Sequence, residues 1–114
     1  MVAYLFALAL LEAAPSGAIT QPIWQTKPTN KDIIKSWPSG ARSIDYARVV
    51  LRCTAGDDGR LQACTAASET PAGYGFDLAA LSLTIKFRLR PKETNGRPVA
   101  GRLINIPMVF RVAY

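Results

Sequence analysis

The stretch Tyr46–Ser68, YARVVLRCTAGDDGRLQACTAAS, decides the fold of this chain. In its first half, Val49, Leu51 and Cys53 alternate with two arginines and a valine, which is the period-2 pattern of a half-buried β-strand. The segment Gly56–Gly59 has turn chemistry, because glycine supplies positive φ and aspartate tolerates left-handed geometry. The sequence therefore predicts a β-hairpin here.

The chain has two cysteines, Cys53 and Cys64, and they fall opposite each other if the hairpin turns between Asp58 and Gly59. Directly opposed residues of antiparallel strands have Cα atoms roughly 4.5 to 5.5 Å apart, which is within the range of a disulfide. We favour a four-residue loop, 57–60, over a two-residue loop, because it places the cysteines at the closer, non-hydrogen-bonded kind of pair. We predict a disulfide; the alternative is a pair of reduced core cysteines.

Length and composition restrict the classes of function. The 114 residues suffice for one domain with one modest core, and a hydrophobic content of 49% excludes a disordered chain. The chain has no histidine, two cysteines alone make a poor zinc site, and the eight acidic residues show no paired-carboxylate spacing. We therefore expect no enzymatic activity, no metal and no cofactor.

The net charge of +6 is compatible with a nucleic acid, an anionic lipid or an acidic protein as partner. However, the 14 basic residues are spread along the chain instead of gathered in one tail. The aromatic residues are two Trp, four Tyr and four Phe, too few to suggest a base-stacking surface. Solvated strand and helix faces explain the charge better, and we expect no nucleic-acid partner.

Residues 1–18 have the pattern of a cleaved secretory signal. Val2–Leu11 is a run of apolar residues too short to cross a bilayer as a helix, which takes about 20 residues. Ser16–Ala18, SGA, resembles a small-x-small cleavage site. Export agrees with the predicted disulfide, because disulfides persist in oxidising compartments. The alternatives are an N-terminal segment that tethers the protein to a membrane and a helix of the core.

Residues 19–36 are expected to form an extended lead-in and a short helix. The helix begins near Thr29 or Asn30, either of which can serve as N-cap, with Asp32 in the first turn. Pro38 ends or kinks it. Its apolar face is expected to consist of Ile33, Ile34 and Trp37.

A second helix is predicted over about residues 77–86, because Phe76, Ala80, Leu83 and Phe87 recur at helical spacing. The period then changes to an alternation that projects basic side chains to one side. This strip consists of Lys86, Arg88, Arg90 and Lys92. It is either a solvated edge or a docking surface for an acidic partner.

The last strand is predicted over Arg102–Val112, where two sets of side chains alternate. One set is apolar: Ile104, Ile106, Met108, Phe110 and Val112. The other set is Leu103, Asn105, Pro107, Val109 and Arg111. Because proline has no N–H to donate, Pro107 confines this segment to an edge strand or a bulge. A right-handed crossover then places it beside the first hairpin strand. The predicted fold is α+β, with a three-stranded antiparallel sheet of order 2-1-3 and two helices packed on one face.

Six segments of residues 37–114 occur in the order of a known domain: Trp37–Ala41, Val49–Leu51 with Asp58–Arg60, Phe76–Leu81, Phe87–Pro91, Gly96–Val99 and Ile106–Phe110. With them, the chain from about Trp37 to Tyr114 resembles the C-terminal domain of the TonB energy-transducer family. The cysteine pair and the loop Ser68–Phe76 look like those of a subgroup of short, exported members.

The resemblance implies a periplasmic module in energy-coupled transmembrane transport. Such a module receives an N-terminal segment of an outer-membrane transporter as an added strand, and it transmits force from an inner-membrane proton-driven complex. The peptide-binding edge would be formed by Leu103, Asn105, Pro107, Val109 and Arg111, with accessory contacts from Trp37, Lys86, Arg88 and Arg90. Two alternatives remain: a homodimerising or scaffolding envelope domain that pairs through the same edge, and a small exported enzyme or inhibitor.

Overall fold

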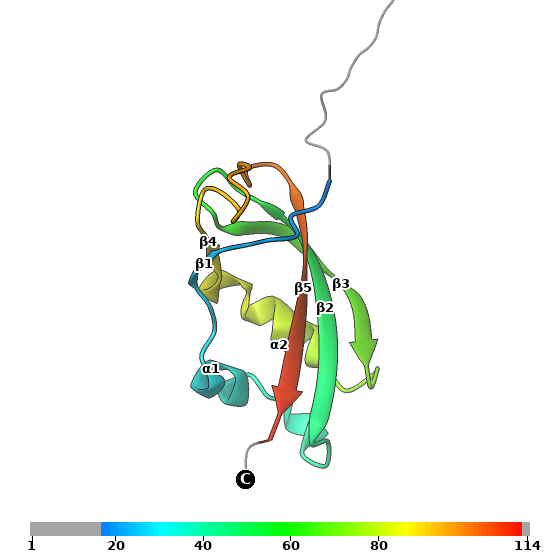
Figure 1. Ribbon diagram of the computed structural model, residues 1–114. Helices are drawn as coiled ribbons and strands as arrows, with labels where there is room; N and C mark the ends of the chain where they lie inside the picture. Colours follow the sequence, from blue (N-terminus) through cyan, green and yellow to red (C-terminus); the bar gives the residue numbers. More distant parts are fainter. Residues whose placement is uncertain (1–16, 113–114) are drawn as a thin grey trace, which may run out of the picture.

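A three-stranded antiparallel sheet is the centre of the structure, a computed structural model that describes residues 17–112 (Figure 1). Its strands are β2 (Tyr46–Ala55), β3 (Leu61–Thr70) and β5 (Leu103–Arg111), in the order β3-β2-β5. The last strand therefore lies beside the first hairpin strand, as predicted. The predicted signal segment, 1–18, falls almost wholly outside the described residues.

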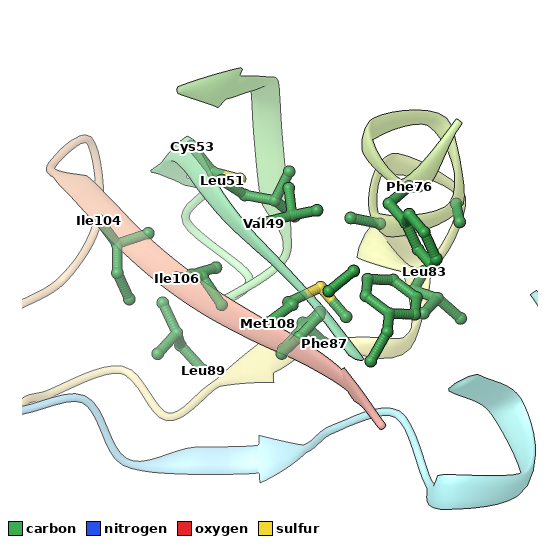
Figure 2. Close-up of a cluster of buried hydrophobic side chains, with 14 of the residues drawn as sticks. Val49, Leu51, Cys53, Phe76, Leu83, Phe87, Leu89, Ile104, Ile106 and Met108 are labelled. Atoms are coloured by element: carbon green, nitrogen blue, oxygen red, sulfur yellow. The ribbon is translucent and has the colours of Figure 1, made fainter. Parts of the chain in front are cut away.

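One face of this sheet is buried under the helix α2 (Phe76–Ser82). Side chains alternate strictly in and out along β5, and the predicted apolar set is buried from Ile104 to Phe110. Figure 2 shows side chains of β2 and β5 pointing toward Phe76 and Leu83. The fold is thus α+β, with a helix packed on an antiparallel sheet.

A second, two-stranded sheet pairs the lead-in with the segment after α2. Its strands are β1 (Trp24–Thr26) and β4 (Arg88–Leu89), which run antiparallel. The Trp24 ring packs against that of Phe87, with centroids 5.0 Å apart, and Leu89 is fully buried. The lead-in is extended, as expected, but its strand was not predicted. The predicted helix 77–86 is shorter, since α2 ends at Ser82 and is followed by a 3₁₀ turn, Thr84–Lys86.

The first helix, α1 (Asn30–Lys35), begins at the predicted Thr29 cap. The backbone N–H of Thr29 donates to the Asp32 carboxylate at 2.8 Å, and this bond, with smaller contributions from the Thr29 hydroxyl and the Lys86 ammonium, lowers the pKa of that carboxyl. However, α1 has no fully buried residue, and Ile34, predicted on its apolar face, is 59% exposed. The predicted packing of a second helix on the sheet is not confirmed. A second 3₁₀ turn, Ser39–Ala41, follows Pro38.

The hairpin differs from the predicted geometry in its turn and in its register. Gly59 N–H donates to Gly56 O at 3.0 Å, and Gly56 N–H donates to Arg60 O at 2.8 Å, so the loop has three residues and not four. Ala63, with φ of 51°, then forms a β-bulge, so that Ala63 and Cys64 together lie opposite Cys53. The bulge returns Cys64 to the position opposite Cys53. The disulfide between them is confirmed, with Cα atoms 4.1 Å apart.

We expect reduction of this disulfide to lower the free energy of unfolding by about 2–3 kcal/mol, because it closes a short loop in the unfolded chain. Urea unfolding with and without dithiothreitol measures the change. The double variant Cys53→Ala/Cys64→Ala is the control, since its stability should not respond to the reductant. A midpoint that stays constant on reduction of the parent protein would contradict the expectation.

Candidate peptide-binding edge

The backbone of β5 has one side paired with β2 and one side directed away from the sheet. Val112 N–H donates to Asp45 O at 3.1 Å, and Ala55 N–H donates to Arg102 O at 2.9 Å. Because bonding residues alternate along an antiparallel strand, the even-numbered residues of this segment bond to β2. The N–H and C=O groups of the odd-numbered residues from Leu103 to Arg111 therefore point away from β2, along the edge predicted for peptide binding.

The lead-in covers only one end of this edge. Ile19 N–H donates to Leu103 O at 2.7 Å, and Ile19 forms a single parallel bridge with Ile104. The lead-in then runs away from β5 toward β1 (Figure 1), and its carbonyls at Gln21 and Ile23 accept from the segment after β4. Among residues 17–112, none pairs its backbone with the edge from 105 to 111.

Pro107 lies in the middle of this free edge. Its register position, opposite Val50, is one at which β5 directs its backbone groups away from β2. The missing N–H of proline therefore removes no hydrogen bond from the sheet. This confirms the prediction that β5 is an edge strand. A strand added here would find N–H donors at Asn105, Val109 and Arg111, and a carbonyl acceptor alone at Pro107.

The side chains of the edge residues are mostly apolar, with the polar Asn105 and the cation Arg111 among them. Val109 is 40% exposed and Leu103 is 47% exposed. Near the end of β5, α1 and the strand enclose a groove of about 200 Å³. The groove is lined by Asn30, Ile33, Ile34, Val109, Arg111 and Val112. The edge therefore combines free backbone groups with an apolar groove, which are the two elements of strand-addition sites.

Trp37, predicted as an accessory contact, is held by the core. Its indole N–H donates to Ala41 O at 3.0 Å, and its ring meets those of Phe76 and Phe110 edge-on, with centroids 5.3 and 6.0 Å away. The side chain is partly buried. The Trp37 side chain therefore belongs to the packing between the core phenylalanines at this end of the sheet.

The predicted basic strip makes its contacts with elements other than β5. Lys86 Nζ lies 3.7 Å from the Asp32 carboxylate, and Arg88 Nε donates to Asp58 O at 2.9 Å. The backbone N–H of Arg90 donates to Ile23 O at 2.8 Å. These contacts join the strip to α1, to the β2–β3 turn and to the lead-in.

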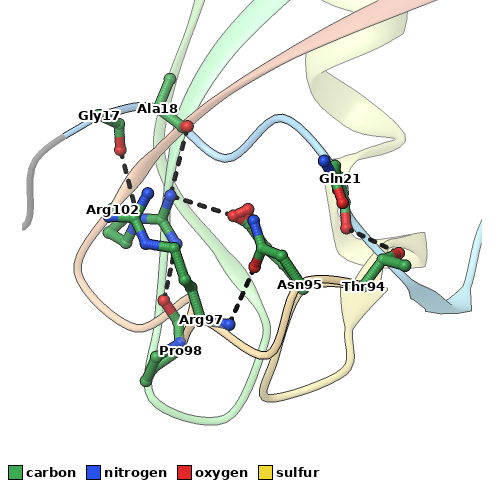
Figure 3. Close-up of polar contacts among 9 residues, drawn as sticks. Gly17, Ala18, Gln21, Thr94, Asn95, Arg97, Pro98 and Arg102 are labelled. Carbon is green, nitrogen blue, oxygen red and sulfur yellow. Dashed lines mark hydrogen bonds and ion pairs between the residues drawn. The ribbon is translucent and has the colours of Figure 1, made fainter.

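Arg102 and Glu93 form a buried ion pair beside the covered end of the edge, which the sequence analysis did not predict. Arg102 Nη2 lies 3.1 Å from the Glu93 carboxylate, and both side chains are at least 96% buried. The same guanidinium donates to the carbonyls of Gly17, Ala18 and Pro98 (Figure 3). The sequence contained one sign of this burial. Arg102 is even-numbered, like the buried residues of β5, so its side chain is expected on the same face. This ion pair fixes the lead-in at the point where it covers the edge.

No group of three or more His, Cys, Asp or Glu side chains within residues 17–112 is arranged to hold a metal ion. None of the helices seen in that range is long and apolar enough to span a membrane.

Comparison with known proteins gives one similarity to report. The chain is 33% identical over 66 residues to an uncharacterized protein of Caulobacter vibrioides. The aligned segment covers 58% of this chain and 66% of that protein, just under two thirds of its length. No family model matches the chain.

Proposed function

We propose that this chain is an exported, periplasmic binding module of the TonB C-terminal type. It captures an extended N-terminal segment of an outer-membrane transporter by strand addition, in energy-coupled transmembrane transport. An inner-membrane proton-driven complex is the expected source of that energy. The module is a binding domain and not an enzyme.

The observation that carries this proposal is the free edge of β5 from 105 to 111. A strand added there satisfies backbone groups that no described residue pairs with, and its alternate side chains read the adjacent surface. The groove beside α1 supplies an apolar contact at the point where Val109 and Arg111 offer N–H donors. The disulfide is compatible with an oxidising compartment such as the periplasm.

The test is titration of the oxidised, ¹⁵N-labelled protein with N-terminal peptides of outer-membrane transporters, followed by amide shifts. We expect the largest shifts at the odd-numbered residues of β5. In Val109→Pro, the edge loses a second N–H donor while the ladder to β2 remains, so affinity should fall tenfold or more. The matched control Val109→Thr keeps the N–H and the β-branched shape, and it should bind like the parent.

Shifts confined to surfaces away from β5, or equal affinity of the proline and threonine variants, would reject this site. The same edge could instead pair with a second copy of the chain in a scaffold. Sedimentation at increasing protein concentration separates the two cases. A species that stays monomeric at high concentration excludes self-pairing.

A further inference from the structure

The face of the three-stranded sheet that looks away from α2 is open to solvent. Along β2, the side chains of this face alternate with the buried core residues, and they are exposed or half-buried: Tyr46, Arg48, Val50, Arg52 and Thr54. Directly paired residues of neighbouring strands share a face, so the odd-numbered residues of β5 belong to it as well. Their counterparts in β3 are all threonine, serine or glutamine. The open face is therefore one continuous surface built from all three strands.

This open face carries positive charge and no carboxylate from its own strands. Arg48, Arg52 and Arg111 belong to it, and no residue paired across it is an aspartate or a glutamate. Glu69 of β3 belongs to the other face, where its carboxylate accepts the backbone N–H of Asp77 at 3.3 Å, at the start of α2. The basic and acidic residues of the sheet are thus separated between its two faces.

The charge is least balanced at the centre of the open face. At one end, Asp45 directly precedes β2 and reduces the net charge beside the Arg111 guanidinium, which lies over the Tyr46 ring, 5.2 Å from its centroid. The aspartates of the β2–β3 turn stand beyond the other end. At the centre, neither Arg48 nor Arg52 forms an ion pair with any residue in the described part of the chain. These two arginines therefore dominate the charge that a partner would meet.

Large apolar side chains are exposed beside these arginines. Tyr46 and Leu103 are each 47% exposed, and Val109, which is paired with Arg48, is 40% exposed. Arg48 and Arg52 stand roughly 13 Å apart along β2, a spacing that suits an array of anions better than one small anion. A soluble polyanion would leave the apolar side chains in water. A bilayer surface would use them, because tyrosine and leucine enter its interfacial region while guanidinium groups contact the headgroups.

We propose that the open face docks on the surface of an anionic phospholipid bilayer. Arg48 and Arg52 contact lipid phosphates, and Tyr46, Leu103 and Val109 contact the interface between headgroups and acyl chains. This role goes beyond peptide capture and does not depend on it. Because the hydrogen bonds between strands lie in the plane of the sheet, docking through the face leaves the β5 edge accessible from the side.

The experiment floats the oxidised protein with vesicles of phosphatidylcholine, either alone or mixed in equal parts with phosphatidylglycerol. We expect binding to the mixed vesicles only, and we expect it to weaken as salt is added. Arg48→Gln/Arg52→Gln should lower the partition coefficient roughly 25-fold, because each arginine near an anionic surface contributes about fivefold. The matched control is Lys27→Gln/Lys92→Gln, which removes the same charge from exposed lysines next to β1 and after β4. It should bind nearly as the parent does.

A nitroxide on the lipid headgroup gives the position of the contact. It should broaden the amide resonances of Arg48, Arg52 and Leu103 more than those of α2, and the reverse order would overturn the proposal. Equal losses in the two double variants would mean that total charge drives binding and not this face. Equally strong binding to phosphatidylcholine alone would exclude the charged contact. If poly-L-glutamate shifts Arg48 and Arg52 while the mixed vesicles do not bind, the partner is an acidic polymer and the lipid assignment is wrong.

Discussion

Replacing Arg102 with methionine should lower the free energy of unfolding by about 3–5 kcal/mol, because it leaves a buried carboxylate without its counter-charge. Glu93 is 3% exposed, and neither of its carboxylate oxygens accepts a hydrogen bond from a described residue. The positive charge of the Arg102 guanidinium, whose Nη2 lies 3.1 Å from the Glu93 carboxylate, balances it. Since domains of this size are stable by roughly 5–15 kcal/mol, this loss is a large part of the total.

Urea unfolding of three variants tests this expectation. Adding Glu93→Met to Arg102→Met removes the unbalanced charge, so the double variant should be more stable than the single one. The control is Arg90→Met, at an exposed arginine, which should change stability by no more than about 0.5 kcal/mol. If the double variant were no more stable than Arg102→Met, the two side chains would not be coupled.

The same ion pair connects stability with the proposed site. Arg102 binds the carbonyls of Gly17 and Ala18, and the next residue, Ile19, covers the edge at Leu103. The pair therefore determines where the free edge begins. Amide shifts of Leu103 in Arg102→Met should accordingly change even without a peptide.

The hairpin was predictable from its sequence in outline and not in detail. Alternation in β2 and the GDDG turn were sufficient for the strands and for the pairing of Cys53 with Cys64. The three-residue loop shifts the register by one position, and the bulge at Ala63 shifts it back. No sequence rule marks an alanine for positive φ. The only sign of the bulge in the sequence was that Leu61, which packs against the core, fell on the opposite face of the sheet in the predicted register.

The edge strand was predictable because two independent signals agree. The strict alternation of β5 fixes which side chains are buried, and Pro107 fixes the strand as an edge. By contrast, β1 has three residues and β4 has two, too few to show a period. These strands form because Trp24, Phe87 and Leu89 pack together, and such tertiary contacts cannot be read from spacing.

The strand of the candidate site was predictable, but the packing of the predicted accessory residues was not. Trp37 was expected to be an accessory contact, and its ring also packs against Phe76 and Phe110, which come from distant parts of the chain. The basic strip was expected to supply accessory contacts; Lys86 contacts α1, which lines the groove beside β5, whereas Arg88 contacts the β2–β3 turn. The position of a surface side chain relative to an edge depends on packing between elements, and the sequence does not encode it locally.

Replacing Gly59 with alanine should lower the free energy of unfolding by about 3 kcal/mol or more, for two reasons. Gly59 has φ of 83°, a conformation that costs an L-residue about 1–2 kcal/mol. In addition, an added Cβ would collide with the backbone carbonyl of Leu89, whose N–H donates to Gly59 O at 2.8 Å. Backbone cannot rotate away as a side chain can, so the β2–β3 turn would have to separate from β4.

Gly96→Ala separates these two reasons. Gly96 has nearly the same conformation, with φ of 85°, at the same place in a similar turn, but nothing lies within 4 Å of its added Cβ. It should therefore lose only the conformational part, about 1–2 kcal/mol. Chemical unfolding of both variants beside the parent measures the difference, which reports the packing of the hairpin turn against β4. Equal losses would mean that this contact gives way at no cost, and that the β1–β4 sheet is not held by the turn.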